Sequence, residues 1–169
     1  VTIVRPFNVY GPGMKIDDQR VVPNFLNAVL DGKVIEIHNQ GEQTRTFSYV
    51  TDAVNGFFRV LLLGRPGEAY NIGSDHEEIS MHELAMRVEK AHGKPLKIKL
   101  AEYPDGYPVG DPNRRMPDIS KARAELAYDP TVTLHDGLKR TLRWFKLLKE
   151  KAPIENTLSR SRHKKAKKK

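Results

Sequence analysis

Apolar residues recur along the chain at two different spacings, and the two alternate. Val22, Phe25, Leu26 and Val29 fall on one helix face behind Pro23, a residue suited to a first helical turn. The same spacing predicts further helices over residues 52–63, 81–92, 119–127 and 134 to about 150. The chain should therefore contain several short helices separated by extended segments.

Side chains next to these helices predict how they start and what they bury. Ser80 and Glu83 have the spacing of a capping box, which predicts a helix start at Ser80. Thr51 is expected to cap the preceding helix. That helix should bury the stripe formed by Val54, Phe57, Phe58, Leu61 and Leu62.

Short β-branched or alternating segments predict strands between the helices. These segments are residues 1–4, 34–37, 44–50, 69–72 and 96–100. Residues 34–37 and 44–50 flank Asn39-Gln40-Gly41, so they are expected to form a hairpin-like pair. Helices that alternate with short strands predict a mixed α/β or α+β fold.

The positive charge of the chain lies almost entirely at its C-terminal end. The 169 residues carry a formal net charge of +8, and residues 160–169 contribute seven basic side chains with no acid. We therefore expect a near-neutral lobe over residues 1–150 and a basic, disordered tail over residues 151–169. A nucleic-acid-binding role would rest on this tail alone and is not expected.

Composition excludes several classes of protein and site. No apolar run approaches the roughly 18 residues that span a bilayer, and no signal peptide is evident. The chain has no cysteine, which excludes disulfides and thiolate chemistry and is compatible with a cytoplasmic protein. The six histidines lack metal-ligand spacing, so no metal site is expected.

Five segments in order resemble the NAD-dependent epimerase/dehydratase family, the extended short-chain dehydrogenase/reductases. They are residues 5–12 (RPFNVYGP), 21–24 (VVPN), 43–50 (QTRTFSYV), 70–73 (YNIG) and 114–119 (RRMPDI). The resemblance implies an α/β fold: the C-terminal substrate lobe with the last strands of a Rossmann sheet, the N-terminal cofactor half being absent from this sequence. It also implies a UDP-sugar or another nucleotide-sugar as ligand, NAD as cofactor of the parent enzyme, and a homodimer formed through the absent half.

Arg45 and Asn8 are the first candidates for contact with a diphosphate. A guanidinium presents a planar fork that grips two phosphate oxygens, which lysine matches less well. The family places arginine and asparagine at these positions beside the pyrophosphate. The alternatives are a solvated strand arginine for Arg45 and a turn-stabilising asparagine for Asn8.

Residues near the nucleotide base are implied by the same resemblance. Val21 and Val22 match the helix beside the base and ribose, although helical core packing explains them equally well. Glu36 and His38 belong to a segment that matches the strand bordering the base. His38 replaces the aromatic residue common there, and an ordinary exposed strand histidine is an equal alternative.

Arg115 and Asp111 lie in a segment rich in proline and glycine. In the decarboxylases of the family, the arginine of an Arg-x-Pro-Asp motif contacts the substrate and is linked to protonation after carbon dioxide leaves. Arg115 is therefore the one candidate here for a catalytic role. Asp111 matches an acidic position that accepts hydrogen bonds from ribose hydroxyls, although a turn before Pro112 also explains it.

Two motifs required for the family's hydride chemistry do not occur in this sequence. No glycine-rich turn follows a first strand, and no tyrosine has lysine four residues later. The chain alone is therefore expected to be inactive. UDP-glucuronate decarboxylase is the nearest branch, with 4-epimerases, 4,6-dehydratases and a non-catalytic binding module derived from such an enzyme as the alternatives.

Overall fold

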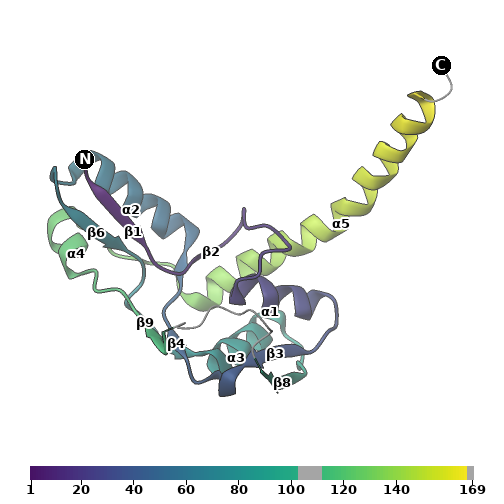
Figure 1. Cartoon of the computed structure of the whole chain (residues 1–169), viewed down its shortest axis with the longest axis horizontal. Helices are drawn as coiled ribbons and strands as arrows, with labels where there is room; N and C mark the ends of the chain where they lie inside the picture. Colours follow the sequence, from purple (N-terminus) through teal and green to yellow (C-terminus); the bar gives the residue numbers. More distant parts are fainter. Residues whose placement is uncertain (103–111, 167–169) are drawn as a thin grey trace.

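The computed structural model describes residues 1–102 and 112–166, with the backbone alone for Asn39 and for residues 151–166. Helices and short strands alternate over these residues, and the strands form small sheets of two or three strands. At the left of Figure 1 lie strands β1 (Ile3–Pro6) and β6 (Ala69–Ile72) with helices α2 (Val50–Leu63) and α4 (Ser120–Leu126). Helices α1 (Val21–Leu30) and α3 (Met81–His92) and strands β3 (Ile35–His38) and β8 (Ile98–Ala101) lie in the lower middle, and helix α5 (Leu134–Ala166) runs to the right. The mixed α/β fold class is confirmed.

A parallel strand pair forms the first part of the fold. Strand β1 (Ile3–Pro6) pairs with β6 (Ala69–Ile72) in the register Ile3 to Ala69. Helices α2 (Val50–Leu63) and α4 (Ser120–Leu126) pack against this pair. The strand predicted at residues 69–72 is thus confirmed, and its parallel partner fits the last strands of a larger α/β sheet.

The buried face of α2 differs from the prediction. Ala53, Gly56 and Val60 are buried against the β1–β6 pair, whereas side chains of the predicted stripe are exposed, with Leu61 at 76% and Leu62 at 75%. A Cβ atom on Gly56 would lie 2.5 Å from the Ile72 Cγ2 atom. The helix therefore approaches the strands through its small residues, which turns the bulky stripe outward.

The start of α2 also differs from the prediction. The helix begins at Val50, directly after strand β5 (Ser48–Tyr49), with Tyr49 as its N-cap residue and no side-chain cap. Thr51 therefore lies inside the first turn and does not cap the helix. Strand β5 pairs in parallel with β2 (Val9–Tyr10), which fixes the chain direction from which α2 emerges.

The predicted hairpin between residues 34–37 and 44–50 is wrong. Strand β3 (Ile35–His38) pairs in parallel with β8 (Ile98–Ala101), with Ile35 opposite Ile98. After the short helix η1 (Asn39–Gly41), the chain enters a different sheet. A parallel pair needs a long crossover, and α2 and α3 lie in the connection between these two strands.

A three-stranded sheet is formed around β4 (Thr44–Arg45). One neighbour, β7 (Ile79–Ser80), is antiparallel, and the other, β9 (Arg114–Arg115), is parallel. Each of these strands has two residues, so few backbone hydrogen bonds hold the sheet together. Side-chain contacts must therefore contribute to its register.

The main hydrophobic core lies between α1 (Val21–Leu30), α3 (Met81–His92) and α5 (Leu134–Ala166). The helix faces predicted from the sequence are confirmed, because the following residues are all buried: Val22, Phe25, Leu26, Val29, Leu84, Ala85 and Val88. The capping box is also confirmed, with the Glu83 amide 3.1 Å from Ser80 Oγ and the Ser80 amide 2.7 Å from Glu83 Oε2.

Helix α5 contributes Leu138 and Phe145 to this core. Its backbone continues to Ala166, past the predicted end at about Glu150. The division into a lobe over residues 1–150 and a basic tail over 151–169 stays a prediction. None of the described helices combines the length and apolar composition needed to cross a membrane.

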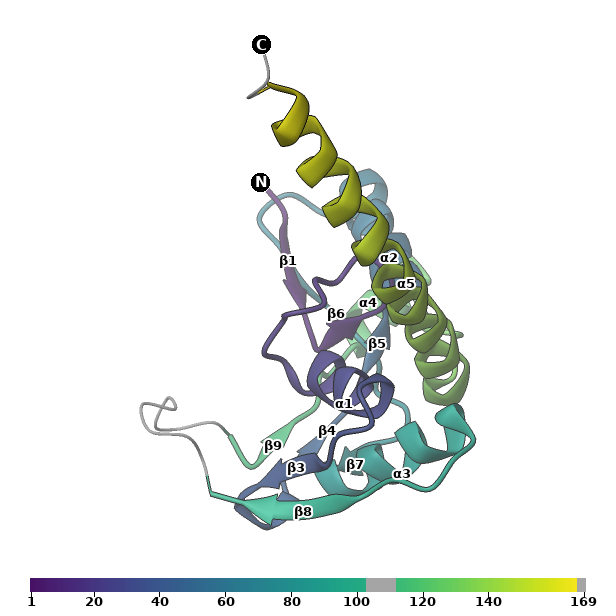
Figure 2. The same ribbon diagram turned by 90° about the vertical axis from the view of Figure 1, so that its right-hand side faces the viewer.

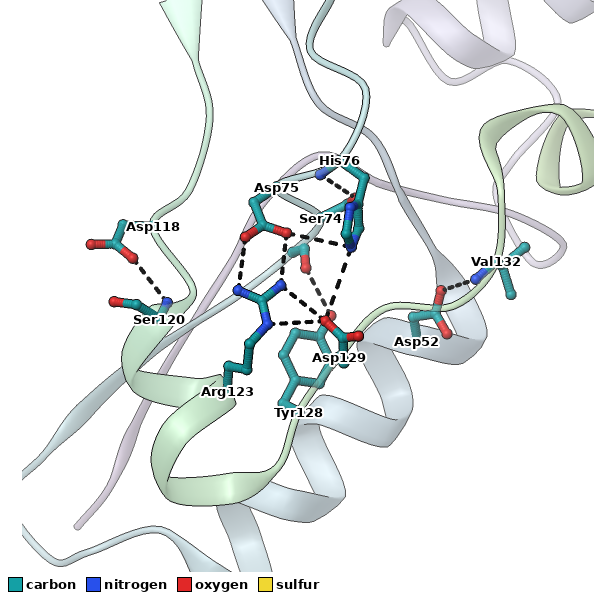
Figure 3. A network of polar contacts seen from close by, with 11 residues as sticks. Asp52, Ser74, Asp75, His76, Asp118, Ser120, Arg123, Tyr128, Asp129 and Val132 are labelled. Carbon is teal, nitrogen blue, oxygen red and sulfur yellow. Dashed lines mark hydrogen bonds and ion pairs between the residues drawn. The ribbon is translucent and has the colours of Figure 1, made fainter.

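A polar network joins the end of β6 to the segment between α4 and α5 (Figure 3). Arg123 donates to both Asp75 oxygens at 3.0 Å and to Asp129 Oδ1 at 2.9 Å. The Arg123 guanidinium holds the pKa of the Asp75 carboxyl below its usual value, so the carboxyl stays ionised at neutral pH. Tyr128 donates to the Gly73 carbonyl at 2.9 Å, and burial raises its pKa to about 12. These contacts fix α4 on the β1–β6 pair.

Candidate functional site

A cavity of about 1110 Å³ lies between α1, β3 and the sheet around β4. Figure 2 shows α1 above β4 and β3 in the lower half of the molecule. Every described residue of the predicted binding set lines this cavity, namely Asn8, Val21, Val22, Glu36, His38, Arg45 and Arg115. Asp111 lies outside the described residues. Positions spread over more than one hundred residues are therefore brought to one place.

Arg45 is held in the wall by the backbone of the neighbouring strands. Its side chain is buried, with an exposed fraction of 7%, and Nη1 donates to the carbonyls of Thr44 at 2.8 Å and Asn113 at 3.3 Å. A buried guanidinium fixed by directional hydrogen bonds is a preorganised cation. The alternative of a solvated strand arginine does not describe this residue.

Arg115 lies beside Arg45 in the parallel pairing of β9 with β4. The sequence placed it in a loop constrained by proline, whereas the structure places it on a two-residue strand and exposed. Pro117, two residues later, is buried and its ring lies near Gly73. The two arginines are therefore adjacent across one strand pair, and guanidinium groups form strong bidentate contacts with phosphate oxygens.

Asn8 occupies the turn between β1 and β2 in a left-handed conformation, with φ of 43°. Its side-chain amide donates to the Thr46 carbonyl at 2.8 Å, and its own carbonyl accepts the Ser48 amide at 3.2 Å. The turn-stabilising interpretation therefore describes what Asn8 does in this structure. An amide nitrogen carries two hydrogens, so this bond uses one of its two donors.

The two valines at the start of α1 differ in their burial. Val22 has an exposed fraction of 2% and belongs to the main core, while Val21 is partly buried and packs against that core. Core packing therefore accounts for Val22, although both residues also contribute to the cavity wall. They provide an apolar surface of the kind against which a planar ring packs.

Strand β3 contributes Glu36 and His38 to the opposite wall. Glu36 lies across from Lys99 in the β3–β8 register, and the two side chains form an ion pair with a distance of 2.8 Å between Nζ and Oε1. Lys99 also lowers the pKa of the Glu36 carboxyl below its usual value. Sequence reasoning missed Lys99, because the wrong hairpin gave β3 a different partner.

The charges on the cavity wall favour an anion. Five cationic and three acidic side chains are among the described lining residues. Each acid has a basic neighbour. Asp18 Oδ2 lies 2.6 Å from Arg20 Nη2, and Asp31 Oδ2 lies 3.4 Å from Lys33 Nζ. Glu36 pairs with Lys99 as described above. The formal excess of two positive charges matches the charge of a diphosphate.

The glycines of the described residues do not form a dinucleotide-binding turn. Gly11 and Gly13 have positive φ values, but they lie in the loop between β2 and α1, and a Cβ on Gly11 would meet the side chain of Val50 at 2.5 Å. Such a turn needs bare backbone at the N-terminus of a helix that follows the first strand. These glycines therefore do not supply the backbone turn that binds the pyrophosphate of NAD.

Comparison with known proteins points to one family. The family model "NAD dependent epimerase/dehydratase family" matches residues 1–73. UDP-glucuronic acid decarboxylase 3 of Arabidopsis thaliana is 43% identical over 139 residues, which are 82% of this chain and 39% of that protein.

The solved structures with a similar fold belong to enzymes that are named for different reactions. UDP-glucuronic acid 4-epimerase of Bacillus cereus, in complex with UDP-glucuronic acid and NAD, is 34% identical with a TM-score of 0.77, over 87% of this chain and 45% of that one. dTDP-glucose 4,6-dehydratase of Bacillus anthracis, in complex with NAD, is 27% identical with a TM-score of 0.76, over 88% and 45%. The chain thus spans less than half the length of each relative.

Proposed function

Because the chain belongs to the NAD-dependent epimerase/dehydratase family, we propose that it forms the nucleotide-sugar-binding lobe of an enzyme most like UDP-glucuronate decarboxylase. The observation that supports this most strongly is the shared cavity. Two arginines on adjacent strands face it together with an apolar helix face and the edge of β3. A diphosphate and a flat base need this combination of directional cations and apolar wall.

Each wall of the cavity has a separate role in the proposed complex. Arg45 and Arg115 hold the diphosphate, and Asn8 donates to a phosphate oxygen with the hydrogen that Thr46 does not use. Val21 and Val22 border the base and ribose, together with Glu36 and His38 on β3. Asp111, in the segment that precedes Arg115, accepts from the ribose hydroxyls.

The cofactor belongs to the remainder of the protein in this proposal. NAD would supply oxidation at C4 of the sugar, bound by a half that carries the glycine-rich turn and the tyrosine-lysine pair missing from this sequence. Alone, the chain binds the nucleotide-sugar without turning it over. A cytoplasmic location and a homodimer formed through the cofactor-binding half are part of the same proposal.

The choice of reaction rests on the relatives and on Arg115. The decarboxylase of Arabidopsis thaliana and this chain share 43% of residues in the matched region. Besides its contact with the diphosphate, Arg115 would reach the sugar and support protonation of the carbon that loses carbon dioxide. The 4-epimerase structure in complex with UDP-glucuronic acid keeps epimerisation of the same substrate as the second candidate.

We predict that a full-length protein joining this lobe to a cofactor-binding half releases carbon dioxide from UDP-glucuronate in the presence of NAD. Trapping of labelled carbon dioxide and chromatography of the products measure this directly. The same assay with UDP-glucose is the control. Turnover of UDP-glucose without release of carbon dioxide from UDP-glucuronate would contradict the decarboxylase proposal and favour an epimerase or dehydratase.

The non-catalytic alternative differs in a result that the same protein gives. A binding module derived from such an enzyme would bind UDP-sugars and turn over neither substrate. Retained UDP affinity with no product from UDP-glucuronate or UDP-glucose would therefore favour a binding module. An in-frame glycine-rich segment and a tyrosine-lysine pair encoded upstream of Val1 would favour an enzyme.

A further inference from the structure

The two faces of the β4–β9 pair carry different side chains. Arg45 and Arg115 line the cavity, whereas Thr44 and Arg114, which lie opposite each other in the register, are not among its lining residues. Successive side chains of a strand point to opposite faces, so this is the expected alternation. The face away from the cavity is where the register of β9 can be fixed.

Glu78, just before β7, contacts both strands on that second face. Its Oε1 atom accepts from Thr44 Oγ1 at 2.6 Å and from Arg114 Nε at 2.8 Å, and its Oε2 atom accepts from Arg114 Nη2 at 2.8 Å. The bidentate pair with Arg114 has the geometry of the strongest carboxylate-guanidinium contacts. Glu78 thereby ties β9 to β4 through side chains from three different segments.

This contact acts on a strand pair with little other support. Strand β9 has two residues, and the Thr44 amide donates to the Asn113 carbonyl at 2.8 Å at its start. Residues 114 and 115 are both arginine, so a shift by one residue would bring Arg114 to the cavity and move Arg115 away. The chain therefore needs a contact that distinguishes the two arginines.

We propose that Glu78 is a positioning residue for nucleotide-sugar binding: by holding Arg114 on the outer face of β9, it keeps Arg115 beside Arg45 in the cavity wall. Arg114 Nη2 also donates to the sulfur of Met116, two residues later, at 3.3 Å, and this contact helps to hold the Arg114 side chain in place. Hydrogen bonds from Arg114 and Thr44 lower the pKa of Glu78, so its carboxylate stays charged at neutral pH. This inference rests on the proposed function, because it assigns Arg115 to the diphosphate.

The test compares binding of UDP and of uridine, which shares the base and ribose but has no phosphate. In Glu78→Gln the bidentate pair with Arg114 is lost while size and the contact with Thr44 are kept. UDP affinity should fall roughly tenfold, the scale of one hydrogen bond to a charged group, with uridine affinity unchanged within about twofold. Titration followed by NMR gives both dissociation constants on the chain as it stands.

Two further variants separate positioning from general damage to the fold. Arg114→Gln, alone or combined with Glu78→Gln, should weaken UDP binding by the same factor as Glu78→Gln alone, because all three break one contact. Glu68→Gln is the matched control, since Glu68 pairs with Lys121 near β6 and does not line the cavity. It should leave both affinities unchanged.

The outcomes distinguish this inference from the proposed function. Failure of the unsubstituted chain to bind UDP would overturn both. Normal UDP binding that is unchanged in Glu78→Gln, or equal losses for UDP and uridine, would overturn the positioning role alone. A loss for UDP that adds further in the double variant would also overturn it, because Glu78 would then act independently of Arg114.

Discussion

Replacing Arg45 with alanine is expected to weaken UDP binding by roughly 1.5–3 kcal/mol, about 10- to 150-fold in the dissociation constant. The reason is its preorganised position. The guanidinium is buried and fixed by the carbonyls of Thr44 and Asn113, so it meets a diphosphate with little loss of side-chain freedom. Calorimetric titration of the chain with UDP measures the change.

Two further variants define what the loss means. Arg45→Lys keeps the charge but not the planar fork, so its affinity should lie between those of Arg45→Ala and the unsubstituted chain. Arg143→Ala removes an exposed arginine of α5 that does not line the cavity, and it should bind UDP normally. Unchanged affinity in Arg45→Ala with an unchanged melting temperature would show that the diphosphate lies elsewhere.

Replacing Phe145 with alanine is expected to lower the free energy of unfolding by about 3–5 kcal/mol, the cost of removing a large buried ring. Phe145 is fully buried in the main core, where α5 packs against α3. Because α1 belongs to the same core, this packing also supports one wall of the cavity. Urea unfolding followed by circular dichroism at 222 nm gives the value.

Leu147→Ala is the matched control for this prediction. Leu147 lies on the same helix, is 42% exposed, and should cost much less when truncated. If both variants unfolded at the same urea concentration as the unsubstituted chain, α5 would not be packed against the core as described here.

Local sequence patterns predicted the elements whose stability depends on near neighbours. The capping box at Ser80 and the apolar face of α3 involve residues three or four positions apart, and both were found where expected. The set of cavity residues came from the family resemblance. Periodicity and composition alone gave no reason to place Asn8 and Arg115 on one wall.

Features that depend on distant partners were not predicted correctly. The pairing of β3 with β8 joins segments about sixty residues apart, and nothing within either segment indicates it. The prediction of which face α2 buries was wrong, because the packing of this helix depends on the close approach of Gly56 to Ile72. In both cases the deciding contact is tertiary, and hydrophobic periodicity does not report it.

The same limit explains the residues that sequence reasoning missed. Lys99 is one basic residue in an alternating segment, and its relation to Glu36 exists only once β3 and β8 are paired. Glu78 resembles any surface glutamate until β7, β4 and β9 form one sheet. Residues that act through a strand register can be identified only when that register is known.

UDP is expected to bind in the cavity between α1, β3 and β4, and an NMR titration of the labelled chain with UDP can locate the site. The largest shifts are expected at the side-chain amide of Asn8, the Nε–H groups of Arg45 and Arg115, and the backbone amides of residues 35–38. Shifts confined to the basic residues 151–169, with the cavity signals unchanged, would contradict it.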